Sequence, residues 1–249
     1  TMVLAGRWSI IRPVHEPNKD GHEAGGGFAS EDFAARLREV MARPLNGWRE
    51  LYESFSPVDL TTGERHPRVP EPGEDHRQAA VLVPVLLEPE GACLVYTVRK
   101  DHLQDHGGQI SFPGGIPELE DDSLRVTALR EAEEEINLRP EVVEVIGELE
   151  DMYIPPSGFL VRPFVGLLPQ EAELDLDPEE VEAIFSVSLE ELASPESFKR
   201  VVWERDGRPH EVPVFAVAGY EIWGATAAMT AALLARLGWE AGNAIRTGD

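Results

Sequence analysis

A run of acidic residues that follows a pair of glycines is the feature that most constrains this chain. Residues 130–135 carry four glutamates, and the upstream segment 112–115 ends in two adjacent glycines. Like charges three and four positions apart destabilise an isolated helix by roughly 0.2–0.5 kcal/mol per pair. A helix built from this segment should therefore lie against something cationic.

The acidic run has its own start and stop signals for a helix. Asp121, Asp122 and Ser123 offer side-chain oxygens that can cap a helix N-terminus. Asn137 tolerates the left-handed conformation that often ends a helix, and Pro140 cannot continue one. The sequence thus predicts a helix between residues 123 and 137.

Helical spacing predicts which side of this helix is buried. The apolar stripe is expected to consist of Val126, Leu129, Ala132 and Ile136. On a helical wheel Glu131, Glu134 and Glu135 share the opposite face, whereas Glu133 falls near the buried edge. Hard divalent cations such as Mg²⁺ and Mn²⁺ take oxygen ligands of this kind. We therefore predict that Glu131, Glu134 and Glu135 hold a metal ion.

The two glycines complete the predicted site. Gly114 and Gly115 lack a Cβ, so the backbone there can turn sharply and bring its own carbonyl or N–H close to a ligand or metal. Pro113 stiffens the approach to this turn. A tight turn beside a carboxylate cluster indicates metal-assisted phosphoryl chemistry.

The order of these residues resembles the box that defines the Nudix hydrolases. In that box a leading glycine and a glutamate precede the pattern Arg-Glu-apolar-any-Glu-Glu-any-Gly. Gly115 matches the leading glycine, and residues 130–135 match the core of the pattern. Asn137 replaces the closing glycine, a mild change because asparagine tolerates the left-handed region. The loop after Gly115 is one residue longer than in the family, and either Asp121 or Asp122 takes the place of the first glutamate.

Further stretches are similar to the coenzyme A pyrophosphatase subfamily of the Nudix hydrolases. They are residues 94–115, 154–163 and 222–226, and the likeness as a whole covers residues 79–238. The resemblance implies an α/β/α Nudix fold with a mixed β-sheet between helices. It also implies Mg²⁺- or Mn²⁺-dependent hydrolysis of coenzyme A or a derivative such as an acyl-CoA.

Two alternatives stay open at this point. One is cleavage of another nucleoside diphosphate-linked compound, such as ADP-ribose, NADH or a dinucleotide polyphosphate. The other is a Nudix domain that binds a nucleotide without turning it over, which the longer loop and the missing box glutamate favour.

Specific roles follow from the residues and from the resemblance. The expected metal ligands are Gly114, Glu131, Glu134 and Glu135. The residues expected to act in catalysis are Arg130, Glu131 and Glu180. The resemblance suggests that Arg130 orients an acidic partner of the box, and that a glutamate of a later loop, here Glu180, serves as general base.

Substrate contacts are expected at three further positions. Arg99 and Lys100 end a predicted strand, where a phosphate or nucleotide can dock, and Tyr153 is expected to contact a base or a pantetheine arm. His106 is interpreted as a local hydrogen-bonding residue, and Trp223 as part of the core.

The composition limits the kinds of partner that this protein is expected to bind. The net charge of −24 over 249 residues argues against nucleic-acid binding, which relies on neutralising many phosphates with Lys and Arg. The longest apolar run, residues 80–87, is too short to span a bilayer, so no membrane partner is expected. The single cysteine, Cys93, rules out an internal disulfide and favours a reducing, cytoplasmic location. The expected partner is a small-molecule nucleotide, and both a monomer and a homodimer stay open.

The pattern along the chain divides it into three parts. Residues 1–77 are interpreted as an N-terminal extension with a Gly-rich and Pro-rich lead-in, one or two helices within 31–52, and a proline-rich loop over 56–77. Residues 78–240 form the predicted Nudix domain, with strands near 79–87, 92–98, 142–149 and 159–167, a hairpin over 198–218 and a last helix over 221–237. Residues 241–249 are the predicted tail.

Overall fold

The computed structural model describes residues 31–65, 69, 76–89, 91–100, 109–155, 157–205 and 207–239. The predictions for the lead-in before residue 31, for His106 and for the tail 241–249 lie outside these residues. Within the described ranges no helix is long and apolar enough to cross a membrane.

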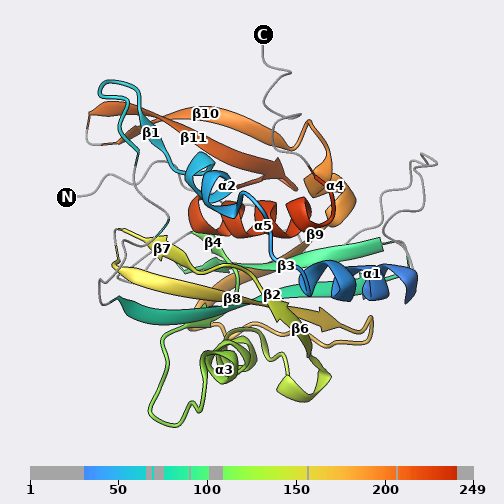
Figure 1. Cartoon of the computed structure of the whole chain (residues 1–249). Helices are drawn as coiled ribbons and strands as arrows, with labels where there is room; N and C mark the ends of the chain where they lie inside the picture. The colour runs from blue at the N-terminus through green and yellow to red at the C-terminus, as the bar shows by residue number, and fades with distance from the viewer. Residues whose placement is uncertain are drawn as a thin grey trace.

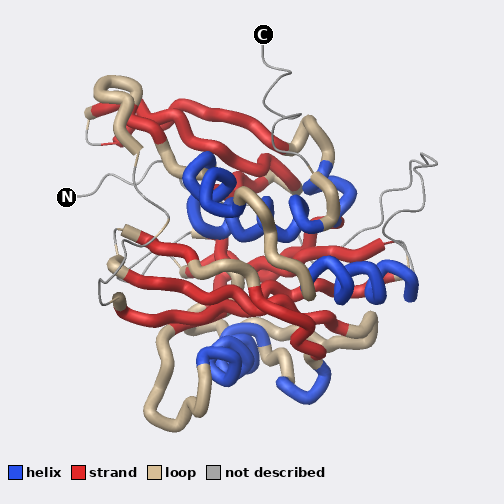
Figure 2. Tube along the Cα trace, viewed as in Figure 1, coloured by secondary structure: helices blue, strands red, loops and turns tan. Residues whose placement is uncertain are grey.

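A large mixed sheet forms the centre of the molecule (Figures 1 and 2). Its central strand β2 (Arg77–Glu88) runs antiparallel to β3 (Gly91–Arg99) and parallel to β8 (Phe159–Leu168). The order along the sheet is β4-β3-β2-β8-β6, with β5 paired to β2, β7 to β8 and β9 to β3. The remaining bounds are β4 (Ile110–Ser111), β5 (Gly114–Gly115), β6 (Glu144–Glu148), β7 (Met152–Ile154) and β9 (Val181–Ser188).

A second, smaller sheet lies on the far side of helix α5 (Gly224–Arg236) from the large one (Figure 1). It is a hairpin of β10 (Phe198–Arg205) and β11 (Arg208–Val217), with β1 (Val58–Asp59) and β12 (Tyr220–Trp223) both paired to β11. The short helix α4 (Leu189–Ala193) connects β9 to β10. The hairpin was predicted, but its place in a separate sheet was not.

Helices cover both faces of the large sheet. Helix α3 (Leu124–Ile136) lies on one face, and α5 lies on the other together with α2 (Trp48–Ser54), while α1 (Glu31–Met41) lies near β6 (Figures 1 and 2). The 3-10 turn η1 (Pro140–Val142) follows α3. The mixed sheet between helical layers is therefore confirmed.

Strand β2 is buried on both faces, which explains its nearly continuous apolar sequence. Val83 and Val85 point into the larger core with α5 and the small sheet, whereas Ala80 and Leu82 pack with α3. This alternation follows from the two-residue period of a strand. Helix α5 is buried nearly all round because it is covered by a sheet on each side.

Two predicted element boundaries are wrong in detail. The predicted last helix begins at Gly224, because residues 220–223 extend the chain as strand β12 on β11. Ile222 therefore belongs to a strand, and Trp223 is half-buried with its ring edge-on to Trp203. The predicted loop over 56–77 also contains β1. The division of the chain at residues 77 and 240 stays a prediction, although Phe33, Leu37 and Tyr52 of the N-terminal helices belong to the same core as α5.

Candidate active site

Helix α3 has the predicted caps. The Ser123 side chain accepts a hydrogen bond from the Val126 N–H, and Asn137 adopts the left-handed conformation with φ 52°. The buried face, however, differs from the predicted stripe. Its members are Thr127, Ala128, Ala132, Glu135 and Ile136.

Three side chains of α3 therefore lie elsewhere than the helical wheel predicted. Val126 is 41% exposed and Glu133 is exposed, whereas Glu135 is buried and not on the solvent face. The reason is that α3 packs on the sheet through the small side chains of Ala128 and Ala132, beside a strand made of glycines. The buried Glu135 carboxylate lies against Arg99 at the end of β3, whereas the glycine strand leaves room for Glu131.

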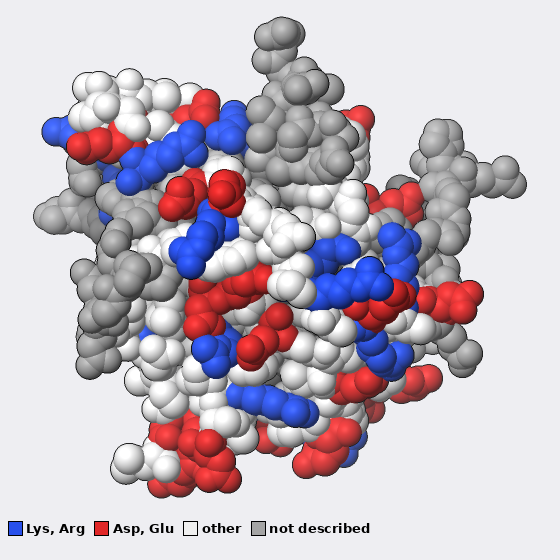
Figure 3. Space-filling model, in the orientation of Figure 1, with Lys and Arg blue, Asp and Glu red and all other residues white. Residues whose placement is uncertain are grey.

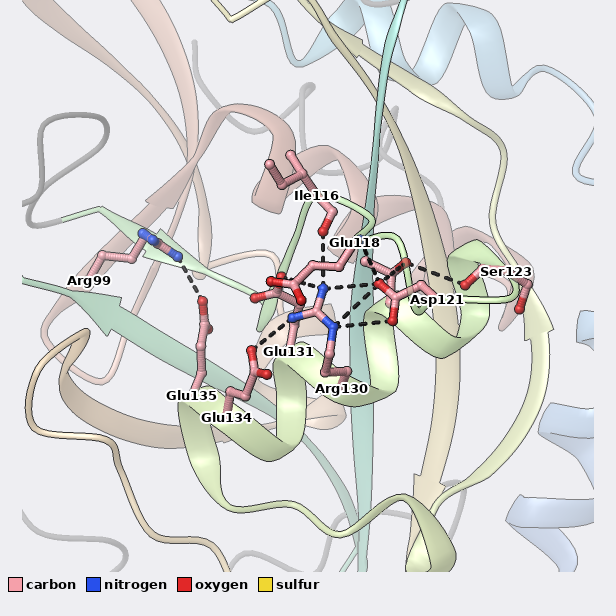
Figure 4. Close-up of polar contacts among 10 residues, drawn as sticks. Arg99, Ile116, Glu118, Asp121, Ser123, Arg130, Glu131, Glu134 and Glu135 are labelled. Carbon is pink, nitrogen blue, oxygen red and sulfur yellow. Dashed lines mark hydrogen bonds and ion pairs between the residues drawn. The ribbon is translucent and has the colours of Figure 1, made fainter.

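Arg130 is at the centre of the polar contacts between the loop after Gly115 and helix α3 (Figure 4). Its Nε donates to Asp121 Oδ1 at 3.2 Å, and its Nη2 donates to Asp121 Oδ2 at 3.1 Å. The Thr127 hydroxyl also donates to Asp121 Oδ2, at 2.9 Å. The guanidinium lowers the pKa of Asp121 to about 2. Of the two candidates for the first box glutamate, Arg130 contacts Asp121 and not the exposed Asp122.

The same guanidinium reaches three other groups. Arg130 Nη1 donates to Glu134 Oε2 at 2.8 Å, and Nη2 lies 3.0 Å from Glu131 Oε1 and donates to the Ile116 carbonyl at 3.1 Å (Figure 4). The hydrogen bond with Asp121 raises the pKa of Arg130 above its ordinary value, and the nearby charges of Glu131 and Glu134 raise it further, although burial lowers it. Arg130 therefore connects the loop to the helix, and its role in orienting an acidic partner stays a prediction. Glu134 points to Arg130 and not to Glu135.

Glycine is needed at positions 114 and 115 for two different structural reasons. A Cβ on Gly114 would lie 2.3 Å from the Ala80 carbonyl oxygen, so only glycine lets β5 pair with β2 at this point. A Cβ on Gly115 would lie 2.3 Å from Glu131 Oε1. Gly115 therefore provides the space in which the Glu131 carboxylate lies.

Glu135 is a buried carboxylate with one partner. Arg99, at the end of β3, donates to Glu135 Oε1 at 2.8 Å, and the Glu135 side chain is 2% exposed. Its other oxygen, Oε2, is buried without a hydrogen-bond partner. Burial raises the pKa of Glu135 to about 7 despite the nearby guanidinium. Arg99, predicted to contact substrate, is thus directed at a predicted metal ligand.

The loop before β9 brings Glu180 to the same region. The Asp177 N–H donates to the Glu135 carbonyl at 3.0 Å, and the Lys100 N–H donates to the Glu180 carbonyl at 3.0 Å. Helix α3 and strand β3 therefore both hold this loop. The exposed Glu180 carboxylate raises the pKa of Glu131 and of Glu135, although burial is the main cause of both shifts.

The remaining two predicted substrate contacts differ in position. The half-buried Lys100 donates its ammonium hydrogen to the Pro178 carbonyl, and so lies beside the loop that carries Glu180. Tyr153 lies on β7, which β8 and β2 separate from the glycine strand, and its ring packs against His76 at 4.8 Å. The structure gathers Arg99, Lys100 and Glu180 near α3, but not Tyr153.

The donor set can be compared with what a divalent cation requires. In the described part of the chain, no three His, Cys, Asp or Glu side chains converge as a ready cluster, because Glu134 turns to Arg130. Three features nevertheless fit a hard cation: the partnerless Glu135 Oε2, the raised pKa of both Glu131 and Glu135, and the Glu131 carboxylate that lies beside Gly115. Glu131 thus lies against Gly115 and Glu135 against Arg99, and the predicted metal trio stays a prediction.

Two contributors were missed at the level of sequence. Thr127 shares Asp121 with Arg130, and the Ile116 carbonyl accepts from the same guanidinium. Thr127 lies three residues before Arg130, a spacing that puts both on one side of a helix, and this could have indicated a shared acidic partner. A backbone carbonyl carries no such signal.

This arrangement of a glycine strand, an arginine-centred loop and a carboxylate-bearing helix on a mixed sheet defines a hydrolase of the Nudix type. The model of the NUDIX domain matches residues 76–206, and the chain belongs to the Nudix family. Nudix hydrolases act on nucleoside diphosphate derivatives and generally use divalent metal ions such as Mg²⁺ or Mn²⁺.

Two relatives of similar sequence are also named Nudix hydrolases. An uncharacterized Nudix hydrolase NudL of Photorhabdus laumondii subsp. laumondii is 41% identical over 154 residues, which span 62% of this chain and 81% of the relative. A NudL of Yersinia pestis is 41% identical over 152 residues, spanning 61% and 75%. Among solved structures, a NUDIX hydrolase from Alicyclobacillus acidocaldarius is 18% identical, with a TM-score of 0.46, over 66% of this chain and 93% of that one.

Proposed function

We propose that this protein hydrolyses the pyrophosphate bond of coenzyme A or an acyl-CoA with the help of Mg²⁺ or Mn²⁺. The products would be 3′,5′-adenosine bisphosphate and 4′-phosphopantetheine or its acyl derivative. The observation that carries the metal dependence is the buried Glu135 carboxylate, whose Oε2 lacks a partner and whose pKa is raised to about 7. A buried carboxylate whose second oxygen has no partner is costly, and a cation lowers that cost.

The proposed metal ligands are Glu131 and Glu135, joined by Glu134 and the Gly114 backbone. When bound, a divalent ion supplies neutralisation of the diphosphate charge and acidifies water. Glu134 is 56% exposed and can turn toward the glycine strand if its contact with Arg130 is released. Arg130 keeps its contacts with Asp121 and Glu131 in that case, so the loop and the helix stay in position.

Other side chains of the site have complementary roles. Glu180 is exposed and lies near both buried glutamates, so it can accept a proton from the attacking water as general base. Water then forms a bond to one phosphorus as the bridging P–O bond breaks, and each product carries one of the two phosphates. Arg99 and Lys100 at the end of β3 supply positive charge for the substrate phosphates. Tyr153 is kept as the proposed contact of the base or pantetheine arm, across β2 and β8 from the glycine strand.

The choice of coenzyme A depends on the extended motif over residues 94–115 and on the similar stretches over 154–163 and 222–226. The alternative substrates are ADP-ribose, NADH and dinucleotide polyphosphates. A domain that binds nucleotide without turnover is a further alternative, and the position of Glu134 against Arg130 favours it.

A substrate panel separates these alternatives. Turnover of coenzyme A, ADP-ribose, NADH and a diadenosine polyphosphate would be measured with Mg²⁺ and with Mn²⁺. We expect the highest kcat/KM with coenzyme A. If the protein turned over none of the four substrates, the proposal that it is an enzyme would be contradicted. Mass analysis of products formed in ¹⁸O-labelled water then identifies the phosphorus that is attacked.

A further inference from the structure

A pocket of about 640 Å³ lies at the end of the small sheet, on the other side of the large sheet and α5 from α3 (Figure 1). This volume is within the range of small-molecule sites. The pocket lies between strand β1, the loop after it and the end of the β10–β11 hairpin. Its lining consists of Pro57, Asp59, Glu64, Arg65, Arg205, Arg208 and His210.

The lining has an unusual charge for this protein. Three arginines and one histidine face two acids, in a chain whose net charge is −24. Figure 3 shows Lys and Arg side chains gathered over this end of the small sheet, whereas Asp and Glu side chains dominate near the bottom of the view. A local excess of arginine on an acidic protein creates a restricted region that attracts anions.

The strand register brings two of these arginines together. Arg205 of β10 and Arg208 of β11 are direct cross-strand partners, so their side chains lie on the same face of the hairpin. His210 lies two positions after Arg208 and so points to the same face of the sheet. An anion between these side chains would contact two guanidinium groups and an imidazole at once.

The two acids of the lining do not use up this charge. Asp59 is almost buried, and its Oδ1 accepts from the Thr61 and Thr62 N–H groups at 2.7 and 3.2 Å. Its Oδ2 accepts from Arg208 Nη1 at 3.3 Å, which engages one of the five donors of that guanidinium. Glu64 is exposed, so water screens its charge.

Arg208, Arg65 and His210 keep donors for a ligand. Arg208 is 58% exposed, and Arg65 has a single long contact, from Nη1 to the Glu53 carbonyl at 3.4 Å. The His210 Nδ1 contacts the Arg208 carbonyl at 3.0 Å, which leaves Nε2 for another partner. Guanidinium groups match phosphate oxygens with paired, charge-assisted hydrogen bonds.

We propose that this pocket binds the phosphate group of a small anionic molecule, with Arg205 and Arg208 as the main contacts and Arg65 and His210 as supporting ones. The proposal is independent of the hydrolase activity, because the residues of the pocket belong to the small sheet and to the segments before and after β1. The site would act as a second, non-catalytic phosphate site of the protein.

Calorimetric titration of the full chain with inorganic phosphate, in buffer containing EDTA, tests this proposal. We expect saturable binding that the Arg205→Gln/Arg208→Gln double variant weakens at least about tenfold, since hydrogen bonds to charged groups are lost. The Arg200→Gln variant is the matched control, because Arg200 lies on the same hairpin but pairs with Glu211 at 2.8 Å outside the pocket. Arg200→Gln should bind phosphate as the wild type does.

Thermal unfolding gives a second readout. Phosphate should raise the Tm of the wild type and of Arg200→Gln, but not that of the double variant, because a ligand stabilises the form that binds it. Absence of binding to the wild type would overturn the proposal. So would binding that survives in the double variant but disappears in Arg99→Gln, which would place it at the candidate active site.

Discussion

The two faces of the large sheet differ in how their charged side chains are paired. On the α3 face, the carboxylates of Asp121, Glu131, Glu134 and Glu135 share the guanidinium groups of Arg130 and Arg99. On the α5 face, Arg236 and Glu150 form a nearly buried one-to-one pair at 2.7 Å, with side chains 4% and 17% exposed. One face keeps negative charge in excess, and the other balances it.

This difference separates function from stability. The Arg236–Glu150 pair connects α5 to the N-terminal helices, since Arg236 also donates to the Arg43 carbonyl and Glu150 Oε1 accepts from the Leu45 N–H at 3.3 Å. The α3 face instead places four carboxylates on two guanidinium groups, and burial raises the pKa of Glu131 and Glu135 there. An excess of carboxylates with raised pKa values is expected where a cationic ligand supplies the missing charge.

The largest expected effect comes from removing a carboxylate on the α3 face. Glu135→Gln should lower kcat by at least about 10³-fold with Mg²⁺, because a metal ligand and its charge are lost. The fold should keep its stability, since a costly buried charge is removed at the same time. Steady-state kinetics and thermal unfolding measure the two. Glu133→Gln is the matched control, because Glu133 is an exposed glutamate of the same helix. Equal activity of the two variants would refute the metal assignment.

Glu150→Ala should lower the stability of the protein and leave its activity unchanged. It leaves the buried Arg236 without its carboxylate, which should cost about 3 kcal/mol in the free energy of unfolding. The kcat measured well below the melting temperature should stay close to that of the wild type. Urea unfolding measures the loss. Glu39→Ala is the control, since Glu39 and Arg43 are 65% and 69% exposed and their contact should contribute under about 0.5 kcal/mol. A Glu150→Ala variant as stable as Glu39→Ala would remove the contrast between the faces.

The two adjacent glycines provide a finer test. Gly115→Ala would push the Glu131 carboxylate aside and should weaken Mn²⁺ affinity by about tenfold, the size of effect seen when the support of a metal ligand is disturbed. Gly114→Ala would contact the backbone of β2 and should lower the Tm instead. Electron paramagnetic resonance of Mn²⁺ and thermal unfolding distinguish the two. If both variants changed only the Tm, Gly115 would have no role at a metal site.

The smallest expected effect concerns acid stability. Asp121 has its pKa lowered from 3.8 to about 2 by Arg130, so the folded state favours the ionised form. Its contribution is present above pH 3.8 and is lost as the pH falls toward 2. Asp121→Asn should therefore flatten the fall in unfolding free energy over this range, whereas Asp122→Asn should not. Urea unfolding at several pH values checks this, and parallel curves for Asp121→Asn and wild type would contradict it.

The predicted strands and the caps of α3 were accurate because each depends on local chemistry. The alternation in β2, the Ser123 cap and the left-handed Asn137 are all set within a few residues. The burial of Glu135 and the exposure of Val126 could not be predicted in this way. They depend on how α3 packs on β2 and β3, strands that lie further back in the chain.

The sequence by itself determined the family, the helix that carries the glutamates and the two glycines beside it, because these features lie in one short segment. Tertiary structure alone decided the rest. It selected Asp121 over Asp122, directed Arg99 at Glu135, turned Glu134 to Arg130 and kept Tyr153 apart. It also placed Arg205 opposite Arg208 beside the loop after β1. The physical reason is that partners of a charge, and the burial that shifts its pKa, come from elements distant in sequence.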